Sequence, residues 1–200
     1  GGQIGGGWNT IVSGLAEIVN EELKGEVELV VVPGAGVSNI ATCSMGNTPI
    51  VMSFLPFIVA AQKGVAPYQQ KYTQTRVIAS GFGTSAQHLV TTRDDLNAYG
   101  DIAAEQIPIR IALNKPGATD EFIWKKVMQY YDMSYEDIKD WGGKVFHVGH
   151  GESISLMKDR HADTHYSYIS VPAASITELS VSRNLKYIGI PDDLHQHLID

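Results

Sequence analysis

The chain has 200 residues, of which 44% are hydrophobic and 18% charged, and it carries a formal net charge of -7. This length and apolar content allow a substantial core, so we expect an ordered protein of one or two domains. The acidic balance excludes nucleic acid and anionic membranes as partners, because binding to either needs clustered Lys and Arg.

The first part of the chain predicts an alternation of helices and short strands. Ile11, Leu15 and Ile18 recur at helical spacing behind a glycine-rich segment, which predicts an amphipathic helix that ends near Gly25. β-branched runs predict strands, and glycines and prolines mark the turns. The elements expected next are a strand at 27–32, a helix from residue 37, a strand at 49–52, a helix at 55–63 and a strand at 76–80.

After Gly83 the pattern starts again, and we place a lobe boundary there, with a first lobe at residues 1–86 and a second at residues 87–200. The second lobe is predicted to contain strands at 87–91, 109–113, 145–148, 164–168 and 185–190, and helices at 119–131, 152–158 and 173–180. Strands joined by helical crossovers predict an α/β fold with doubly wound parallel sheets, which bind ligands at the carboxyl ends of their strands.

Three loops share one arrangement, in which small residues or a Pro-Gly turn lead directly into a predicted helix: residues 5–8, 33–38 and 114–119. Free backbone N–H groups at a helix N-terminus favour a carboxylate or phosphate, and glycine allows a ligand to come close. One such loop is typical of an ordinary turn, but three in one chain favour a binding site. We therefore expect Gly5 to Thr10, Gly36 to Asn39 and Pro116 to Asp120 to converge on one cleft.

Metal and catalytic sites are not favoured. His161 and His165 would lie about 13 Å apart along a strand, too far for one zinc ion. The chain lacks the Gly-x-Ser-x-Gly motif of hydrolases and the Gly-x-Gly-x-x-Gly motif of dinucleotide sites. The single cysteine, Cys43, excludes an internal disulfide and has no obvious base beside it. We therefore expect no catalytic residue, no metal and no cofactor.

The sequence shows no signal peptide and no apolar run near the roughly 20 residues of a membrane helix, so we expect a water-soluble chain. A mature exported protein and a cytoplasmic one would look alike on this evidence. Tryptophans are usually found in the core or as surface anchors, and we expect this for Trp124 and Trp141. Trp8 lies inside a candidate loop and is therefore a candidate site residue.

The order of several segments resembles the TAXI family of solute-binding receptors. Residues 5–8 leading to 14–20 are similar to the family's opening Gly-Gly loop and its Ala-Leu-Ala-Glu-Ile helix. Residues 34–40 resemble its Gly-Gly-Ser-Val-Glu-Asn-Leu segment, and Pro116-Gly117 resembles its Pro-Gly-Ser-Gly-Thr-Glu loop. Further matches follow in the right order at Gln87–Val90, Tyr135–Ile138, Leu156–Asp159, Asp163, Pro172–Ala174 and Glu178–Leu179.

This resemblance implies a type II periplasmic binding protein fold with two lobes and a cleft. It implies a receptor in the periplasm that binds a small organic acid such as glutamate or 2-oxoglutarate and delivers it to the membrane permease subunits of a TRAP transporter. The positions matched to the family's ligand loops are Gly6, Gly7, Trp8, Asn9, Thr10, Gly36, Val37, Ser38, Asn39, Pro116, Gly117, Ala118, Thr119, Asp120 and Pro172.

The chain departs from the family pattern in two respects. Gly36 stands where the family has Ser, Trp8 and Asn9 replace a Tyr pair, and residues 118–120 replace Ser, Gly and Thr. The family's first strand and its returning C-terminal segment have no counterpart, so we expect an incomplete first lobe with apolar surface near Val30 and Ile50. Two alternatives remain open, namely the ligand-sensing lobe of a transcription regulator and an enzyme on a similar two-lobe scaffold.

Overall fold

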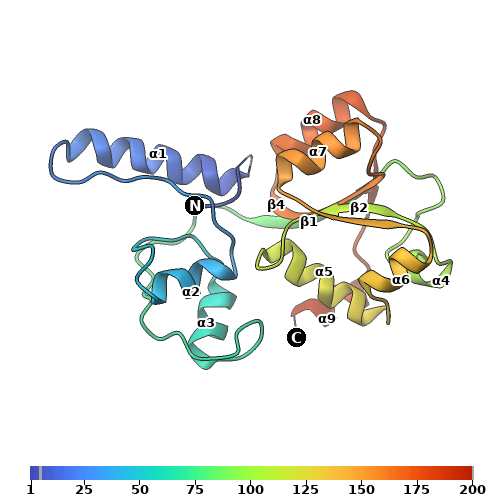
Figure 1. Ribbon diagram of the computed structural model, residues 1–200, viewed down its shortest axis with the longest axis horizontal. Coiled ribbons are helices and arrows are strands. Elements are labelled where there is room, and N and C mark those ends of the chain that lie inside the picture. Colours follow the sequence, from blue (N-terminus) through green and yellow to red (C-terminus); the bar gives the residue numbers. More distant parts are fainter. Residues whose placement is uncertain (5, 200) are drawn as a thin grey trace. The chain divides into compact units, whose positions relative to one another are not determined.

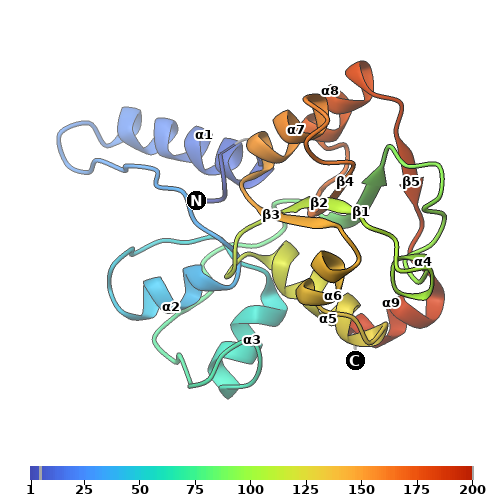
Figure 2. The same ribbon diagram turned by 45° about the vertical axis from the view of Figure 1, so that its right-hand side comes forward.

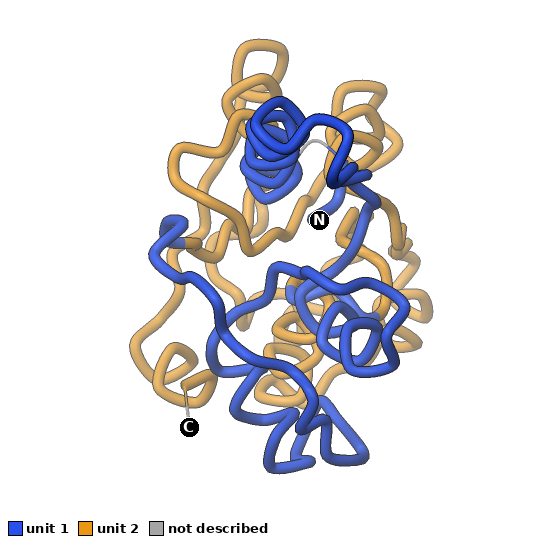
Figure 3. Tube along the Cα trace, turned by 90° about the vertical axis from the view of Figure 1, so that its left-hand side faces the viewer, with its two compact units in different colours: residues 1–84, 117–119 blue, residues 85–116, 120–200 orange. Residues whose placement is uncertain are grey.

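The computed structural model describes residues 1–4 and 6–199, and the contacts within it divide the chain into two units. Unit 1 comprises residues 1–84 together with 117–119, and unit 2 comprises residues 85–116 and 120–200 (Figure 3). The loop that precedes the longest helix of unit 2 therefore contributes three residues to unit 1.

The described part of unit 1 contains three helices, α1 (Gly7–Glu22), α2 (Ser38–Ser44) and α3 (Leu55–Lys63), at the places that the sequence predicted (Figure 1). Helix α3 has a proline in its first turn, where the missing N–H costs nothing. It ends at Gly64, whose left-handed backbone (φ 71°, ψ 35°) brings its N–H to the Ala60 and Ala61 carbonyls at 2.8 and 3.3 Å.

The strands predicted at 27–32, 49–52 and 76–80 are not formed, and the described part of unit 1 contains no strand. A strand needs a neighbour to pair its backbone, and in the first of these segments a side chain takes that place at Leu29. The Asn20 side chain accepts from the Leu29 N–H at 2.6 Å and donates to the Leu29 carbonyl at 3.0 Å. Val30 is 74% exposed and Ile50 is 56% exposed, which is the apolar surface that we expected near them.

Unit 2 is built on a five-stranded sheet with the order β3-β2-β4-β1-β5. Its strands are β1 (Ser85–Thr91), β2 (Arg110–Leu113), β3 (Lys144–His147), β4 (Thr164–Ser170) and β5 (Lys186–Ile188). Its helices are α4 (Asp101–Ala104), α5 (Thr119–Tyr130), α6 (Tyr135–Asp140), α7 (His150–Lys158), α8 (Ala174–Ser182) and α9 (Asp192–Ile199). The five strands and α5, α7 and α8 were predicted, whereas α4, α6 and α9 are too short to show a clear helical period.

The sheet is mixed, which corrects the prediction of purely parallel sheets. Strand β2 runs parallel to β3 and β4, but β1 is antiparallel to both β4 and β5. Strand β1 pairs with β4 from Ser85 opposite Ser170 to Thr91 opposite Thr164. An apolar run reads the same in either direction, so the path of the chain, and not the pattern, fixes the direction of β1.

Helices cover both faces of this sheet (Figures 1 and 2). One face carries α5, α6 and α9 around the fully buried Trp124, and the other carries α7 and α8 around Ala112 and Leu179. Ile111 and Leu113 belong to the first core and Ala112 to the second, as the two-residue period of a strand requires. None of the described helices combines the length and the apolarity that crossing a membrane requires.

Candidate functional site

The three predicted loops meet around Gly36 in unit 1. A Cβ added to Gly36 would overlap Oγ1 of Thr119 and would lie 3.6 Å from ring atoms of both Trp8 and Phe54. Trp8 stands in the first turn of α1, Thr119 begins α5, and Phe54 directly precedes α3. Gly36 is therefore the point where side chains from distant segments approach one backbone position, and the absence of a Cβ there leaves room for the Thr119 hydroxyl.

Aromatic rings form one side of this cluster. The ring centroids of Trp8 and Phe54 lie 4.6 Å apart with the planes tilted by 45°, and Phe57 meets Phe54 edge-on at 6.3 Å. These separations are typical of attractive aromatic pairs. Phe57 is 8% exposed, whereas Trp8 and Phe54 are only half-buried. The structure thus gives Trp8 an apolar neighbour beside the small residues of the loop.

Asn39 holds the loop in place. Its Nδ2 donates to the carbonyls of Gly1 and Met52 at 3.2 and 2.7 Å, and its Oδ1 accepts from the Ala35 N–H at 3.0 Å. Both amide hydrogens are used, and the residue is 5% exposed. Asn39, one of the predicted ligand residues, therefore has its hydrogen-bonding groups engaged in positioning the loop.

The carbonyls of the loop are held in the same way. Ser53 Oγ donates to the Gly36 carbonyl at 2.7 Å, and the Tyr68 hydroxyl donates to the Val37 carbonyl at 2.9 Å. Burial raises the pKa of Tyr68, so this phenol stays protonated as a donor. Within the described chain the N–H groups of Gly36 and Val37 donate no hydrogen bond. The carbonyls of Gly36 and Val37 thus accept hydrogen bonds within the chain, whereas the N–H groups of the same two residues are available to a ligand.

The second loop reaches this one through Gly117. The Ser38 N–H donates to the Gly117 carbonyl at 3.3 Å, and Gly117 has a left-handed backbone with φ +90°. Thr119 is 5% exposed, and its hydroxyl forms no hydrogen bond with any described residue. Helix α2 has only seven residues, so Ser38 contributes its side chain here and not the N-terminus of a long helix. Helix α5 has twelve residues and a full N-terminal turn.

The remaining predicted residues lie at the start of α1, in the loops and in unit 2. Gly6 is the N-cap of α1, Gly7 is its first residue, and Asn9 and Thr10 complete its first turn. Ala118 is 3% exposed beside Thr119. Pro116, Asp120 and Pro172 belong to unit 2, with Pro172 exposed in the connection from β4 to α8. Gly5 lies outside the described residues.

A buried polar cluster in unit 2 was not foreseen from the sequence. Asp120 Oδ2 lies 3.6 Å from His150 Nε2, and the Asn114 amide lies 3.5 Å from the same nitrogen. The rings of His150 and His165 are 6.4 Å apart. Asn114 and His150 follow the parallel strands β2 and β3, so the rule that polar groups gather at carboxyl ends of parallel strands is the signal that could have found them.

Burial sets the charges in this cluster. It raises the pKa of Asp120, while the nearby His150 and hydrogen bonds from backbone groups and from Asn114 act in the opposite direction. Burial, together with the neighbouring His150, lowers the pKa of His165 to about 3. Nδ1 of His165 lies 3.0 Å from the Ala112 carbonyl, so Nδ1 carries the proton of a neutral ring. His165 is therefore uncharged at neutral pH.

The cluster offers no assembled catalytic machinery among the described residues. No serine, threonine or cysteine there hydrogen-bonds to His150 or Asp120, and no group of three or more His, Cys, Asp and Glu side chains could hold a metal ion. The arrangement fixes the first turn of α5, since Asp120 follows Thr119 directly.

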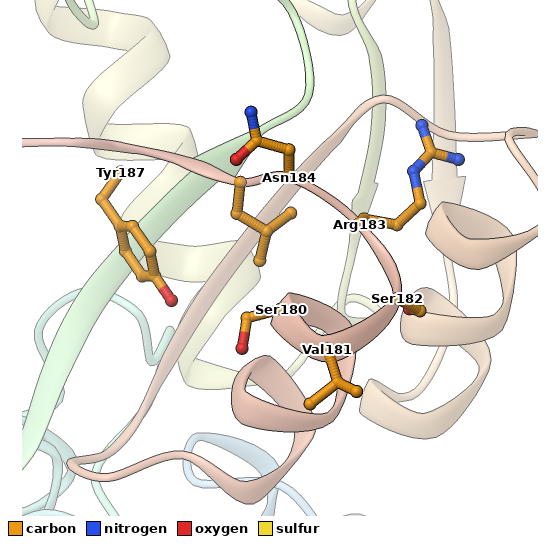
Figure 4. A pocket seen from close by; sticks show the side chains of 7 residues that line it. Ser180, Val181, Ser182, Arg183, Asn184 and Tyr187 are labelled. Carbon is orange, nitrogen blue, oxygen red and sulfur yellow. The ribbon is translucent and has the colours of Figure 1, made fainter.

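A separate shallow pocket of about 370 Å³ lies at the end of α8 and the start of β5 (Figure 4). The Arg183 guanidinium donates to the Met157 and Lys158 carbonyls, and the Ser180 and Ser182 hydroxyls donate to carbonyls of their own helix. The side chains of Arg183, Ser180 and Ser182 are thus engaged within the chain, and we assign the pocket no ligand.

The contact between Gly36 and Thr119 predicts that a second substitution restores the stability lost through a first one. Replacing Gly36 with alanine is expected to cost about 1 to 3 kcal/mol of stability, because the new Cβ overlaps Thr119 Oγ1 and a packed site relaxes only partly. The double variant G36A/T119A should recover most of this loss, measured by urea unfolding. Gly151, where an added Cβ meets nothing within 4 Å, provides the control G151A. Equal losses in G36A and G36A/T119A would contradict the assigned contact.

The comparisons with known proteins bear on this geometry. A family model described as the NMT1-like family matches residues 1–200. The chain belongs to the NMT1-like family. Its fold is the α/β fold of type II periplasmic binding proteins. Among curated proteins, none matches this NMT1-like chain.

Three solved structures that are similar to this NMT1-like protein are distant from it in sequence. The ancestral amino acid-binding protein AncCDT-1, a precursor of cyclohexadienyl dehydratase, is 17% identical with a TM-score of 0.50, over 90% of this chain and 66% of its own. The alkanesulfonate-binding protein SsuA from Xanthomonas axonopodis pv. citri, bound to MOPS, is 12% identical with a TM-score of 0.51, over 95% and 59%. Arginine-bound truncated ArgBP from T. maritima is 15% identical with a TM-score of 0.50, over 93% and 80%.

These similarities establish the fold and nothing further. The chain spans 66% and 59% of the lengths of AncCDT-1 and SsuA, respectively.

Proposed function

We propose that this chain is a solute-binding receptor that captures a small organic acid. The observation that carries the proposal is the meeting of three loops around Gly36, with the Gly36 and Val37 N–H groups and the Thr119 hydroxyl left without partners among the described residues. Such donors suit a carboxylate, which accepts several hydrogen bonds at once. The type II periplasmic binding protein fold, whose solved examples include arginine-bound and MOPS-bound proteins, supports the same proposal.

We further propose that the receptor works in the periplasm and delivers its ligand to the permease subunits of a TRAP transporter of the TAXI type. The support for this step is the resemblance of residues 5–20, 34–40 and 116–120 to the segments of that family, in the family's order. The same resemblance suggests a carboxylate of the glutamate or 2-oxoglutarate kind. Native mass spectrometry of the purified protein, with extraction of any retained ligand, tests the ligand class directly.

The anion is held mainly by backbone donors in this proposal. The five arginines of the chain, Arg76, Arg93, Arg110, Arg160 and Arg183, all lie outside the predicted loops. Arg76, the one in unit 1, donates to the Thr73 and Thr75 carbonyls at 2.6 and 2.8 Å. A bidentate arginine clamp therefore has no place in the loop cluster of unit 1, and the fixed backbone geometry takes over its role.

The proposal predicts unequal effects of two kinds of variant on affinity. Ser38→Ala and Thr119→Ala should each weaken ligand binding only about fivefold, the worth of one hydrogen bond of about 1 kcal/mol, because the backbone donors remain. Gly117→Val should weaken it far more, since φ +90° is strained for a β-branched residue and the loop must shift. Calorimetry with the retained ligand measures both. An arginine-to-alanine variant that abolishes binding while G117V binds normally would overturn the backbone account.

A further inference from the structure

The half-buried aromatic pair gives the candidate site an apolar side. Trp8 and Phe54 lie with ring centroids 4.6 Å apart, and each has a ring atom 3.6 Å from the position of a Cβ on Gly36. Phe57 supports Phe54 from behind at 6.3 Å and is itself buried. Aromatic side chains that are held this way and stay partly exposed offer a flat apolar surface to a neighbouring group.

The polar side of the same cluster is small and uncharged. It consists of the Thr119 hydroxyl, the Gly36 and Val37 N–H groups, and the Ser38 hydroxyl, whose bond to the Ala35 carbonyl is long at 3.4 Å. Within the described chain, the Thr119 hydroxyl and the two N–H groups make no hydrogen bond. Neutral donors of this kind have the chemistry to bind one carboxylate.

No basic side chain of the described part of unit 1 lies at this cluster. The four basic side chains of the unit are those of Lys24, Lys63, Lys71 and Arg76. Lys63 ends α3, roughly 12 Å along the helix from its first residue, and Lys24 lies beyond the far end of α1 from Trp8. Lys71 packs against Gly64 at the C-terminal end of α3, and Arg76 binds its own backbone. A second carboxylate on the ligand would therefore find no basic side chain of unit 1 to pair with. The balance of one polar anchor and an apolar surface thus favours a ligand with a single negative charge.

We propose that the ligand is an aryl-substituted monocarboxylic acid, with its carboxylate on the Gly36, Val37 and Thr119 donors and its ring against Trp8 and Phe54. This inference rests on the proposed function as an organic-acid receptor, and it replaces the glutamate or 2-oxoglutarate kind of acid that the resemblance suggests with an aryl acid. A flat ring can pack against the aromatic pair, and its burial supplies the binding energy that a second ion pair would otherwise give.

The test is calorimetry with two sets of probes: phenylacetate and indole-3-acetate against succinate, 2-oxoglutarate and glutamate. We expect the aryl acids to bind at least tenfold more tightly. In Trp8→Leu this preference should disappear, whereas Trp8→Phe, which keeps a ring, should retain part of it. Trp141→Phe in unit 2 is the matched control and should bind as the unchanged protein does, with circular dichroism confirming that every variant is folded.

Fluorescence gives an independent readout, because Trp8 is one of three tryptophans. Phenylacetate, which has no indole emission of its own, should quench the emission of the unchanged protein and of W141F, but not that of W8L. Tighter binding of dicarboxylates, or a W8L variant that weakens both probe sets equally, would overturn the aryl-acid inference while leaving the receptor function standing. Binding of neither set would count against the organic-acid receptor itself, and with it against this inference.

Discussion

Replacing Asn39 with alanine is expected to destabilise unit 1 by about 3 kcal/mol. The side chain makes three hydrogen bonds, to the carbonyls of Gly1 and Met52 and from the N–H of Ala35, and it is 5% exposed. Alanine would leave buried backbone groups without partners, and their desolvation is then uncompensated. Asn39→Asp should be at least as damaging, because a carboxylate would face two carbonyl oxygens.

Hydrogen exchange measured by mass spectrometry resolves this effect by segment. Peptides covering residues 34–53 should exchange roughly 100-fold faster in N39A, since 1.4 kcal/mol corresponds to a factor of ten, while peptides of unit 2 stay unchanged. Asn47→Ala is the matched control, because Asn47 is exposed and only its backbone N–H is bonded, to Thr42. Unaltered exchange in 34–53 would show that Asn39 does not hold the loop.

The second large effect concerns pH and His165. The pKa of this ring is about 3 in the folded chain, against 6.5 when unfolded, because the ring is buried. Between these values the unfolded chain binds a proton that the folded chain does not, so stability is full above pH 6.5 and falls as the pH falls toward 3. A pH change from 7 to 5 should remove about 2 kcal/mol from unit 2 through this residue alone.

His165→Asn tests the assignment, because an asparagine amide can replace the Nδ1 donor to the Ala112 carbonyl without titrating. Urea unfolding between pH 5 and pH 7.5, followed by tryptophan fluorescence, should show a shallower loss of stability in H165N than in the unchanged protein. The raised pKa of Asp120 affects stability in the opposite direction, because its contribution is lost as the pH rises above 3.8. This contribution is present in both H165N and the unchanged protein. The exposed His161→Asn serves as control, and parallel curves for H165N and the unchanged protein would refute the role of His165.

Much of unit 2 could be predicted because its elements are locally encoded. The strand around Ala112 and the helix around Trp124 have apolar residues at the period of a buried strand and of an amphipathic helix. The predicted strands of unit 1 failed for a related reason: the run at 27–32 has strand composition, but a strand also requires a partner, and Asn20 pairs with Leu29 in its place.

The candidate site, too, could be predicted only in part from the sequence. The glycine loops and Trp8 could be singled out from the sequence, since small residues before a helix are a local signal. Phe54 could not, because nothing in its neighbourhood marks an aromatic residue before a helix as anything but core. The role of Asn39 could not be predicted either. Its side chain bonds to Gly1 and Met52, which are 38 and 13 positions away in the sequence, and the sequence alone gives no distance between such segments.

By itself the sequence determined the α/β class, the order of most elements and the loops in which a ligand would be sought, because all of these follow from residue types within one or two turns of chain. Only the tertiary structure decided that β1 runs antiparallel, that Gly36 lies against Thr119 and Trp8, and that His165 is buried beside His150. These facts depend on contacts between segments far apart in the chain. Their energies come from packing and desolvation, which appear only when the chain is folded.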